Sequence, residues 1–375
     1  MQPCLPPASS ALPETGLAEL AAQLVAIDSV NPGLIHGAAG EREVAYFVRD
    51  WCAQRGLEVE LVGPPDRPSV IARARGTGSG RSLLLNGHLD TVGVAGMDSP
   101  FEPRVEDGRL YGRGAYDMKG AIAAVMDATV RARELELAGD VVLTAVADEE
   151  LGSLGTIAVL EHVRADAAVV VEPTELELAV AHKGFVGFEF ETHGLAAHGS
   201  RPHLGVDAIA KMGPVLVALE ALDARLQSGS RHPLVGSGSA HASLIEGGQE
   251  FSSYPARCVL VGERRTIAGE TVQAVEKELR SVAGEAELRP TVSRDPFEIA
   301  PDHPFVELVS RVSASAEPVG ASYWADSGLI ASAGIPVVLY GPLGEGAHAD
   351  VEWVDLSSLE RVRDVVLQVA AEWCS

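Results

Sequence analysis

The chain has few basic residues, few aromatic residues and few cysteines, and it contains no long apolar run. Its 375 residues include 29 Lys and Arg against 53 Asp and Glu, which gives a formal net charge of −24. Because such a surface repels polyanions, neither nucleic acid nor an anionic membrane is expected as a partner. No apolar stretch reaches the roughly 18 residues that a membrane span needs. No membrane segment is therefore expected.

Cysteine is sparse, and its four positions show no CxxC spacing. We expect free thiols at Cys4, Cys52, Cys258 and Cys374, as is typical of a reducing cytoplasm. The opening residues 1–16 have no basic segment followed by a continuous apolar one, so no secretion signal is expected. These features together predict a cytoplasmic protein.

The length exceeds what one ordinary hydrophobic core supports, which predicts two domains. Apolar residues recur at helical spacing in the first fifty residues, and short β-rich runs then alternate with a further helical segment. Such alternation predicts an α/β domain with a largely parallel, buried sheet and helices on both faces. The expected strands are 57–62, 69–73, 82–86, 141–150 and 167–173, and the helix between them is 119–135.

The pattern of strands and helices changes near His182. Residues 182–295 predict a separate α+β unit that is inserted into the first domain. The α/β pattern resumes with a helix at 304–315, a strand at 336–340 and a last helix at about 356–373. We therefore expect the first domain to be formed by residues 1–181 and 296–375.

Polar residues follow the apolar strand of "LLLNGHLDTV". Successive strand residues alternate faces, so His88 and Asp90 point to the same side. A metal-binding imidazole usually donates its second ring N–H to a carboxylate, which fixes the orientation of the ring. His88 and Asp90 match such a pair, although a lone pair of this kind at a strand end is more often an ordinary polar pair of a loop.

A second cluster surrounds Asp117 in "GRGAYDMKGAIAAVMDA". Asp117 precedes an apolar helix and could serve as its N-terminal cap, as Asp often does. A cap does not require Gly112, Gly114 and Gly120 around it, whereas a tightly packed site does.

The remaining clusters also follow apolar strands. In "VADEELGS" the residues Asp148, Glu149 and Glu150 stand together, and such carboxylates repel one another unless cations neutralise them. A solvated acidic loop is the alternative. Glu172 ends the apolar run "VVVEP", and His348 lies in a Gly-rich loop after the strand at 336–340.

Four of these clusters follow predicted strands, and Asp117 opens a helix close to them in the chain. In open α/β sheets, the carboxyl edge of the strands is where binding sites form. Two histidines with several carboxylates make a nitrogen and oxygen donor set that suits zinc. A nucleotide site is not expected, because "GTGSG" at 76–80 lacks the GxGxxG spacing.

The sequence resembles the zinc amidohydrolases that include acetylornithine deacetylase, succinyl-diaminopimelate desuccinylase, aminoacylase and carboxypeptidase G. The resemblance runs from "AIDSVNP" to "AHADVEWV". It implies a dizinc hydrolase of an N-acyl amino acid, of the acetylornithine or succinyl-diaminopimelate type, with cobalt or manganese as possible substitutes. A dipeptidase or a carboxypeptidase is the alternative. The matching motifs, in family order, are "GHLDTV", "GRGAYDMKGAIAA", "ADEELGS", "VVEPT", "AAHGSRPHLGVDAI" and "GAHADVEW".

The resemblance also implies a role for each clustered residue. Asp90 would orient a metal-binding histidine, and Glu149 would be the general base and acid. A non-catalytic relative is a third possibility, but it would be expected to lack Glu149 or one of the ligands. The implied ligands are His88 and Glu172 for one zinc, Glu150 and His348 for the other, and Asp117 for both.

The inserted unit resembles the family's lid, which often makes a homodimer contact. His198 matches a lid histidine that reaches the partner's site and stabilises an oxyanion, although it could be a loop histidine without a role. Arg264 falls where the family has an arginine that grips a substrate carboxylate, with Arg265 as its rival. Ser252 stands where relatives have a substrate-contacting Asn, and Asp326 is a candidate for contact with a substrate amine.

Overall fold

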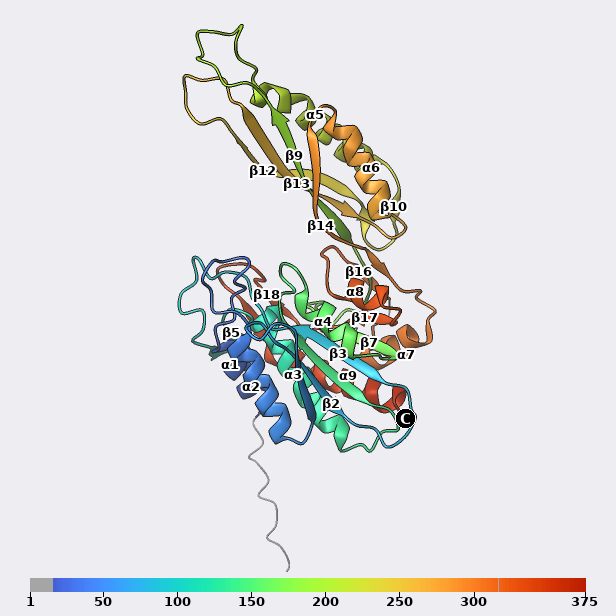
Figure 1. The fold of residues 1–375 in the computed structure, drawn as a ribbon. Helices are drawn as coiled ribbons and strands as arrows, with labels where there is room; N and C mark the ends of the chain where they lie inside the picture. The colour runs from blue at the N-terminus through green and yellow to red at the C-terminus, as the bar shows by residue number, and fades with distance from the viewer. Residues whose placement is uncertain (1–15, 316) are drawn as a thin grey trace, which may run out of the picture.

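The computed structural model describes residues 16–315 and 317–375, and it shows two lobes joined by two chain crossings (Figure 1). The N-terminal and C-terminal parts of the chain build the larger lobe, and the middle of the chain builds the smaller one. Within the described ranges no helix has both the length and the apolar character needed to cross a membrane. Cys52, Cys258 and Cys374 are buried free thiols, while Cys4 and residues 1–15 lie outside the described residues.

The larger lobe contains a sheet in the order β1-β2-β6-β3-β7-β17-β8-β15, with β16 beside β8. Its centre is parallel, because β3 pairs in parallel with β6 and β7, and β17 pairs in parallel with β7. The predicted largely parallel sheet is confirmed. The strands are β1 (Glu58–Val62), β2 (Ser69–Ala74), β3 (Leu83–His88), β6 (Val141–Val146), β7 (Ala167–Val170), β8 (Ala179–His182), β15 (Phe297–Glu298), β16 (Val319–Ala321) and β17 (Val337–Leu339).

Helices cover both faces of this sheet, as expected, and neighbouring residues of β3 show it. Asn86 points to one face and hydrogen-bonds Thr156 of α4, whereas a side chain at Gly87 would strike Ile122 of α3 on the other. Helices α1 and α9 pack against α3. The helices of this lobe are α1 (Leu17–Val25), α2 (Arg42–Gln54), η1 (Ala115–Lys119), α3 (Gly120–Arg133), α4 (Leu154–His162), α7 (Pro304–Ser313), α8 (Ser327–Ser332) and α9 (Leu356–Trp373).

A small antiparallel sheet, which the sequence did not predict, runs beside η1 in the order β18-β19-β5-β4. It joins the segment before Asp117 to the segment after His348, because β5 pairs with β19. Two parts of the chain that carry candidate ligands are thereby held together. Its strands are β4 (Arg104–Glu106), β5 (Arg109–Tyr111), β18 (Gly344–Glu345) and β19 (Trp353–Asp355).

The smaller lobe is an antiparallel four-stranded sheet in the order β12-β13-β9-β14, with two helices packed on it. It has a hydrophobic cluster of its own, which includes Phe188, Phe190 and Leu279. We keep 182–295 as the proposed limits of this unit, and we refer to it as the lid. Its elements are β9 (Gly184–His193), α5 (Ala208–Ser228), β10 (Arg231–His232), β11 (Gly236–Ser237), β12 (Ser239–Gly247), β13 (Arg257–Thr266), α6 (Val272–Ala283) and β14 (Glu287–Arg294).

Candidate metal centre

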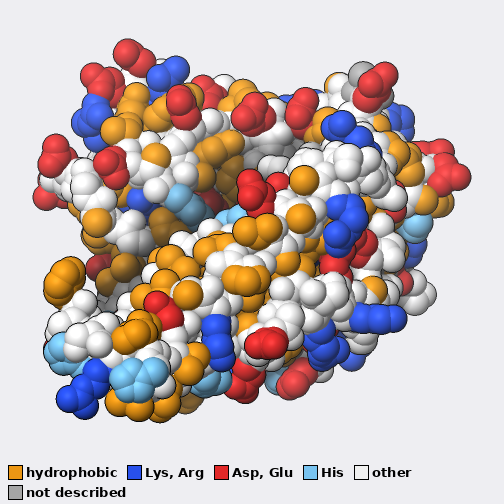
Figure 2. Space-filling model, turned by 90° about the horizontal axis from the view of Figure 1, so that it is seen from above, with side chains coloured by type: hydrophobic (Ala, Val, Ile, Leu, Met, Phe, Trp, Pro, Cys, Tyr) orange, Lys and Arg blue, Asp and Glu red, His pale blue; other side chains and the backbone are white. Residues whose placement is uncertain are grey.

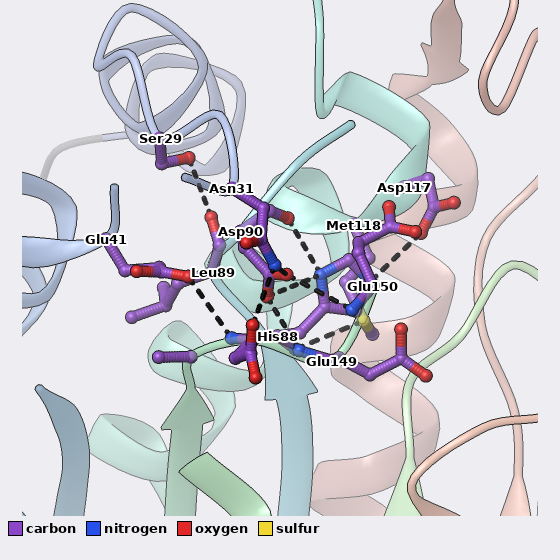
Figure 3. A network of polar contacts seen from close by, with 12 residues as sticks. Ser29, Asn31, Glu41, His88, Leu89, Asp90, Asp117, Met118, Glu149 and Glu150 are labelled. Atoms are coloured by element: carbon purple, nitrogen blue, oxygen red, sulfur yellow. Dashed lines mark hydrogen bonds and ion pairs between the residues drawn. The ribbon is translucent and has the colours of Figure 1, made fainter. Parts of the chain in front are cut away.

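The candidate centre begins where β3 ends. His88 is the last residue of β3 and is buried, and Asp90 follows two residues later with no exposed surface (Figure 3). The His88 Nδ1 atom donates to the Asp90 carbonyl oxygen at 2.9 Å, while the Asp90 Oδ1 atom is 3.7 Å away. The backbone of Asp90 therefore makes the closer contact that orients the ring, rather than the expected carboxylate. The Nε2 atom of His88 is left to face the site.

The carboxylate of Asp90 is instead bonded to the acidic segment that follows β6. Its Oδ1 accepts from the Glu149 N–H at 3.0 Å, and its Oδ2 accepts from the Glu150 N–H at 3.1 Å. Asp90 thus connects the histidine at the end of one strand to the acidic turn after the neighbouring strand.

Asp117, which belongs to η1, lies between His88 and His348. Its Oδ1 is 3.1 Å from His88 Nε2, and its Oδ2 is 3.4 Å from His348 Nε2. The first turn of α3 has no side-chain cap. Asp117 therefore does not cap this helix, which was the alternative to a role in the site. The Asp117 carboxylate is shared between two sides of one site.

Glu352 holds the backbone around Asp117, although we gave it no role from the sequence. Its carboxylate accepts the N–H groups of Gly114, Tyr116 and Asp117 and pairs with Arg113 at 2.6 Å. Glu352 stands four residues after His348 in "GAHADVEW", so that motif contained the available signal. These bonds fix the position of Asp117 against the loop that carries His348.

The acidic turn lies beyond its strand. We predicted a strand over 141–150, but β6 ends at Val146 because Asp148 adopts a left-handed conformation with φ of 68°. Beyond that bend, Glu150 Oε2 lies 3.1 Å from His348 Nε2, and the buried Glu150 Oε1 has no hydrogen-bond partner. Among the residues described, we find no hydrogen bond or ion pair to the Glu149 carboxylate.

Two ligand groups result, and both include Asp117. One is formed by His88, Asp117 and Glu172, and the other by Asp117, Glu150 and His348. Within each group the candidate ligand atoms all lie within 4.8 Å of one another. Imidazole and carboxylate donors in this number suit zinc and related divalent ions. The unpartnered Glu150 Oε1 fits such an ion as well, because a buried carboxylate oxygen needs a partner.

The charges in the centre are not balanced by the protein. Burial, together with the nearby charges of Asp117 and Glu150, raises the pKa of Glu172 to about 8. Burial also raises the pKa of Glu149 well above its ordinary value. Hydrogen bonds to Asp117 and Glu150 raise the pKa of His348 to about 10. The surplus of negative charge favours a bound cation.

The structure places His198 and Ser252 together in the lid, away from this cluster. Both are exposed, and Gly199 N–H donates to the Ser252 carbonyl oxygen at 2.6 Å. The Nδ1 atom of His198 lies 2.8 Å from Ser200 Oγ. Within the part of the chain that the structure describes, neither residue contacts a candidate metal ligand.

Arg264 does not fit the role that we expected for it. Only 1 % of its surface is exposed, and its guanidinium bonds Glu270 and Glu278 within the lid. Strand alternation turns Arg264 to the helix-covered face of the lid sheet and Arg265 to the other face. Arg265 is partly exposed, lies beside Phe185 and pairs with Glu263 at 2.7 Å.

Asp326 is likewise buried rather than open to a substrate amine. It is 1 % exposed, and its carboxylate accepts from Thr156 Oγ1 at 2.5 Å. Burial raises its pKa to about 6. The contact with a substrate amine stays a prediction, and the carboxylate is buried against Thr156 of α4.

A two-lobed α/β fold with a carboxylate and histidine centre at the carboxyl edge of its sheet defines a metallohydrolase-type protein. The chain belongs to peptidase family M20/M25/M40, whose family model matches residues 84–372. It is accordingly a hydrolase that acts on amide bonds. The resemblance noted in the sequence is thereby confirmed.

Three similar proteins illustrate this membership. Acetylornithine deacetylase of Myxococcus xanthus is 31 % identical, and the alignment covers 94 % of this chain and 96 % of the deacetylase. The N-formyl-4-amino-5-aminomethyl-2-methylpyrimidine deformylase of Halalkalibacterium halodurans is 28 % identical, and the alignment covers 96 % of this chain and 94 % of the deformylase. The Bacillus subtilis YXEP protein, described as a dinuclear metal binding peptidase from the M20 family, matches in structure with a TM-score of 0.71 and 18 % identity, covering 96 % of this chain and 97 % of its own.

Proposed function

We propose that the protein removes the acyl group from an N-acyl amino acid and that two divalent ions, zinc in the first place, occupy its centre. The observation that carries this proposal is the pair of ligand groups that share Asp117, with the uncommitted Glu149 beside them. The 31 % identity to an acetylornithine deacetylase supports this choice of substrate class.

In this proposal each side chain of the centre has one task. His88 and Glu172 hold one ion, Glu150 and His348 hold the other, and Asp117 contributes to both. When bound, the two ions supply Lewis acidity that polarises the amide carbonyl and lowers the pKa of the attacking water. Cobalt or manganese would suit the same donors.

Glu149 moves the proton. Its carboxylate takes a proton from the attacking water and then delivers it to the nitrogen of the leaving amine. Two features support this role. Its backbone is anchored on Asp90, and its carboxylate has no competing partner among the described residues. Burial raises its pKa above the ordinary value of a glutamate, which makes the carboxylate a stronger base.

We further propose a homodimer formed through the lid. The edge strand β12 is exposed along most of its length, including Leu244 at 69 % and Ile245 at 54 %. Figure 2 shows apolar side chains gathered on the face seen from the lid end, beside a hollow. In such a dimer, His198 of each protomer would reach the partner's centre and donate to the developing oxyanion.

A dipeptidase or exopeptidase remains the competing assignment within the family. The solved structure that we compare is of a peptidase, but at 18 % identity it shows the fold alone. A non-catalytic relative is disfavoured, because every proposed ligand and Glu149 are present. The three buried free cysteines support our proposal of a cytoplasmic location.

The test is to dialyse the protein against a chelator, restore zinc or cobalt, and assay N-acetyl amino acids, N-succinyl amino acids and dipeptides. We expect turnover of an N-acyl amino acid, and only after metal is restored. Faster turnover of dipeptides than of N-acyl amino acids would show that the protein is a peptidase. If two metals bind and no substrate is hydrolysed, the proposed function is wrong.

A further inference from the structure

Asn31 bridges two buried carboxylates that are distant in the sequence. It follows α1 and has no exposed surface. Its Nδ2 donates to Asp90 Oδ2 at 2.8 Å (Figure 3) and to Asp148 Oδ1 at 3.0 Å. Its Oδ1 accepts from Gly33 N–H at 2.8 Å. Both amide hydrogens are therefore committed to carboxylates at the base of the candidate centre.

An asparagine suits this position for a chemical reason. Two buried carboxylates close together repel each other, and a side-chain amide offers one N–H to each without adding charge. The Asp90 carboxylate that Asn31 holds also accepts the N–H groups of Glu149 and Glu150. Asn31 therefore acts on the turn that presents both glutamates.

The other end of the bridge is held just as firmly. Asp148 begins the turn in a left-handed conformation, in which a residue other than glycine needs support. Arg67 lies 2.9 Å from its Oδ1, and Glu41 Oε1 accepts its N–H at 3.2 Å. Glu41 also pairs with Arg67, so one guanidinium is shared by the two carboxylates. The neutral Asn31 joins this ion-paired set to Asp90 at the base of the centre.

We propose that Asn31 is a positioning residue for the reaction. It acts through Asp90 and Asp148 to hold the turn in which Glu149 faces the substrate and Glu150 faces the ion. The catalytic part of this inference rests on the proposed function. The geometric part concerns only the turn and its affinity for metal.

The same segment offers a matched control. The Ser29 hydroxyl is buried and donates to the Leu89 carbonyl oxygen at 2.7 Å. It ties the N-terminal segment to the loop after β3 but touches no carboxylate. Ser29→Ala therefore removes one buried hydrogen bond between the same two segments and leaves the bridge intact.

The test compares Asn31→Asp, Asn31→Ser and Ser29→Ala in the full-length protein. Backbone amide exchange at residues 148–153, Co²⁺ affinity, and kcat and KM for N-acetylornithine are measured for each. Asn31→Asp removes both donors and should lower Co²⁺ affinity and kcat by about 10- to 100-fold, as loss of a group behind a metal ligand typically does. Amide exchange in the turn should accelerate, and KM should change little.

Asn31→Ser retains one donor and should give intermediate values, and it serves as the decisive variant if Asn31→Asp does not fold. Ser29→Ala should keep wild-type exchange, affinity and kcat. Folded Asn31 variants with wild-type exchange and Co²⁺ affinity would overturn the proposal, as would equal losses in Ser29→Ala. If the wild type binds Co²⁺ but hydrolyses no acyl amino acid, the proposed function fails, while exchange and affinity still decide the role of Asn31.

Discussion

Two clusters of buried charge in this molecule differ in whether their charges are matched. In the lid, the guanidinium of Arg264 bonds Glu270, Glu278 and a backbone carbonyl oxygen, and Glu278 also pairs with Arg225, so two cations face two carboxylates. At the carboxyl edge of the large sheet, carboxylates outnumber imidazoles, and Glu150 Oε1 has no partner. A matched cluster stabilises the fold, whereas an unmatched one is suited to bind a cation.

Removal of metal should have the largest effect and should act on the unmatched cluster alone. A chelator should abolish turnover, and zinc should restore it. Zinc at about 1,000 times its dissociation constant should add roughly 4 kcal/mol to the free energy of unfolding. Calorimetry with and without chelator measures this stabilisation. Equal stability in both conditions would contradict a bound ion.

Glu149→Gln should separate catalysis from metal binding. The amide cannot take up the proton, so kcat should fall by about 1,000-fold. Zinc content should stay at the wild-type level, because Glu149 belongs to neither ligand group. Kinetic assays and elemental analysis of the same sample provide the test. Retained turnover would remove Glu149 from its proposed role.

Arg264→Met should disturb the matched cluster and leave the chemistry unchanged. It leaves Glu270 without its cation and Glu278 with Arg225 alone. Because both carboxylates are partly exposed, the loss of stability should be smaller than the roughly 3–5 kcal/mol that breaking a fully buried pair costs. Chemical denaturation measures this loss, and KM of the folded fraction should not change. Arg265→Met, on the opposite face, is the control and should unfold near the wild-type midpoint. A raised KM in Arg264→Met alone would restore the substrate role first expected for Arg264.

The smallest expected effect concerns the pH dependence of stability and involves His182. Within the described residues, this histidine is buried without an acidic partner, unlike the histidines of the centre. It packs on Phe297 with ring centroids 5.2 Å apart, and burial lowers its pKa from 6.5 to about 4. Between these pH values the unfolded chain binds a proton that the folded protein does not, so stability falls as the pH falls. The shift corresponds to roughly 3 kcal/mol.

His182→Phe should remove this component of acid sensitivity. Metal-free wild type and variant are compared by denaturation at pH 4 and at pH 7. The variant should lose less stability on acidification. An identical loss in both proteins would show that His182 does not titrate in this window.

Residues at the ends of strands were the easiest to predict from the sequence. His88, Glu149 and Glu172 each follow an apolar run, and parallel strands present such positions along one edge. The order of the motifs further implied that Asp117 and His348 join them. The small sheet beside η1 could not be predicted, because its two-residue and three-residue strands leave no periodic pattern.

Contacts between distant segments could not be predicted from the sequence. The choice between Arg264 and Arg265 depends on a register shift of one residue, which exchanges the two faces of a strand. The use of the Asp90 carboxylate by the acidic turn depends on a left-handed residue at Asp148. The bridge made by Asn31 spans 59 and 117 residues, so no local spacing reveals it.

The central claim is that the unmatched carboxylates hold two divalent ions that share Asp117. Anomalous diffraction from crystals grown with zinc tests it most directly. Two zinc peaks should flank Asp117, one beside His88 and Glu172 and the other beside Glu150 and His348. Zinc-saturated crystals without a peak at Asp117, or with one peak that contacts only one of the two groups, would contradict the claim.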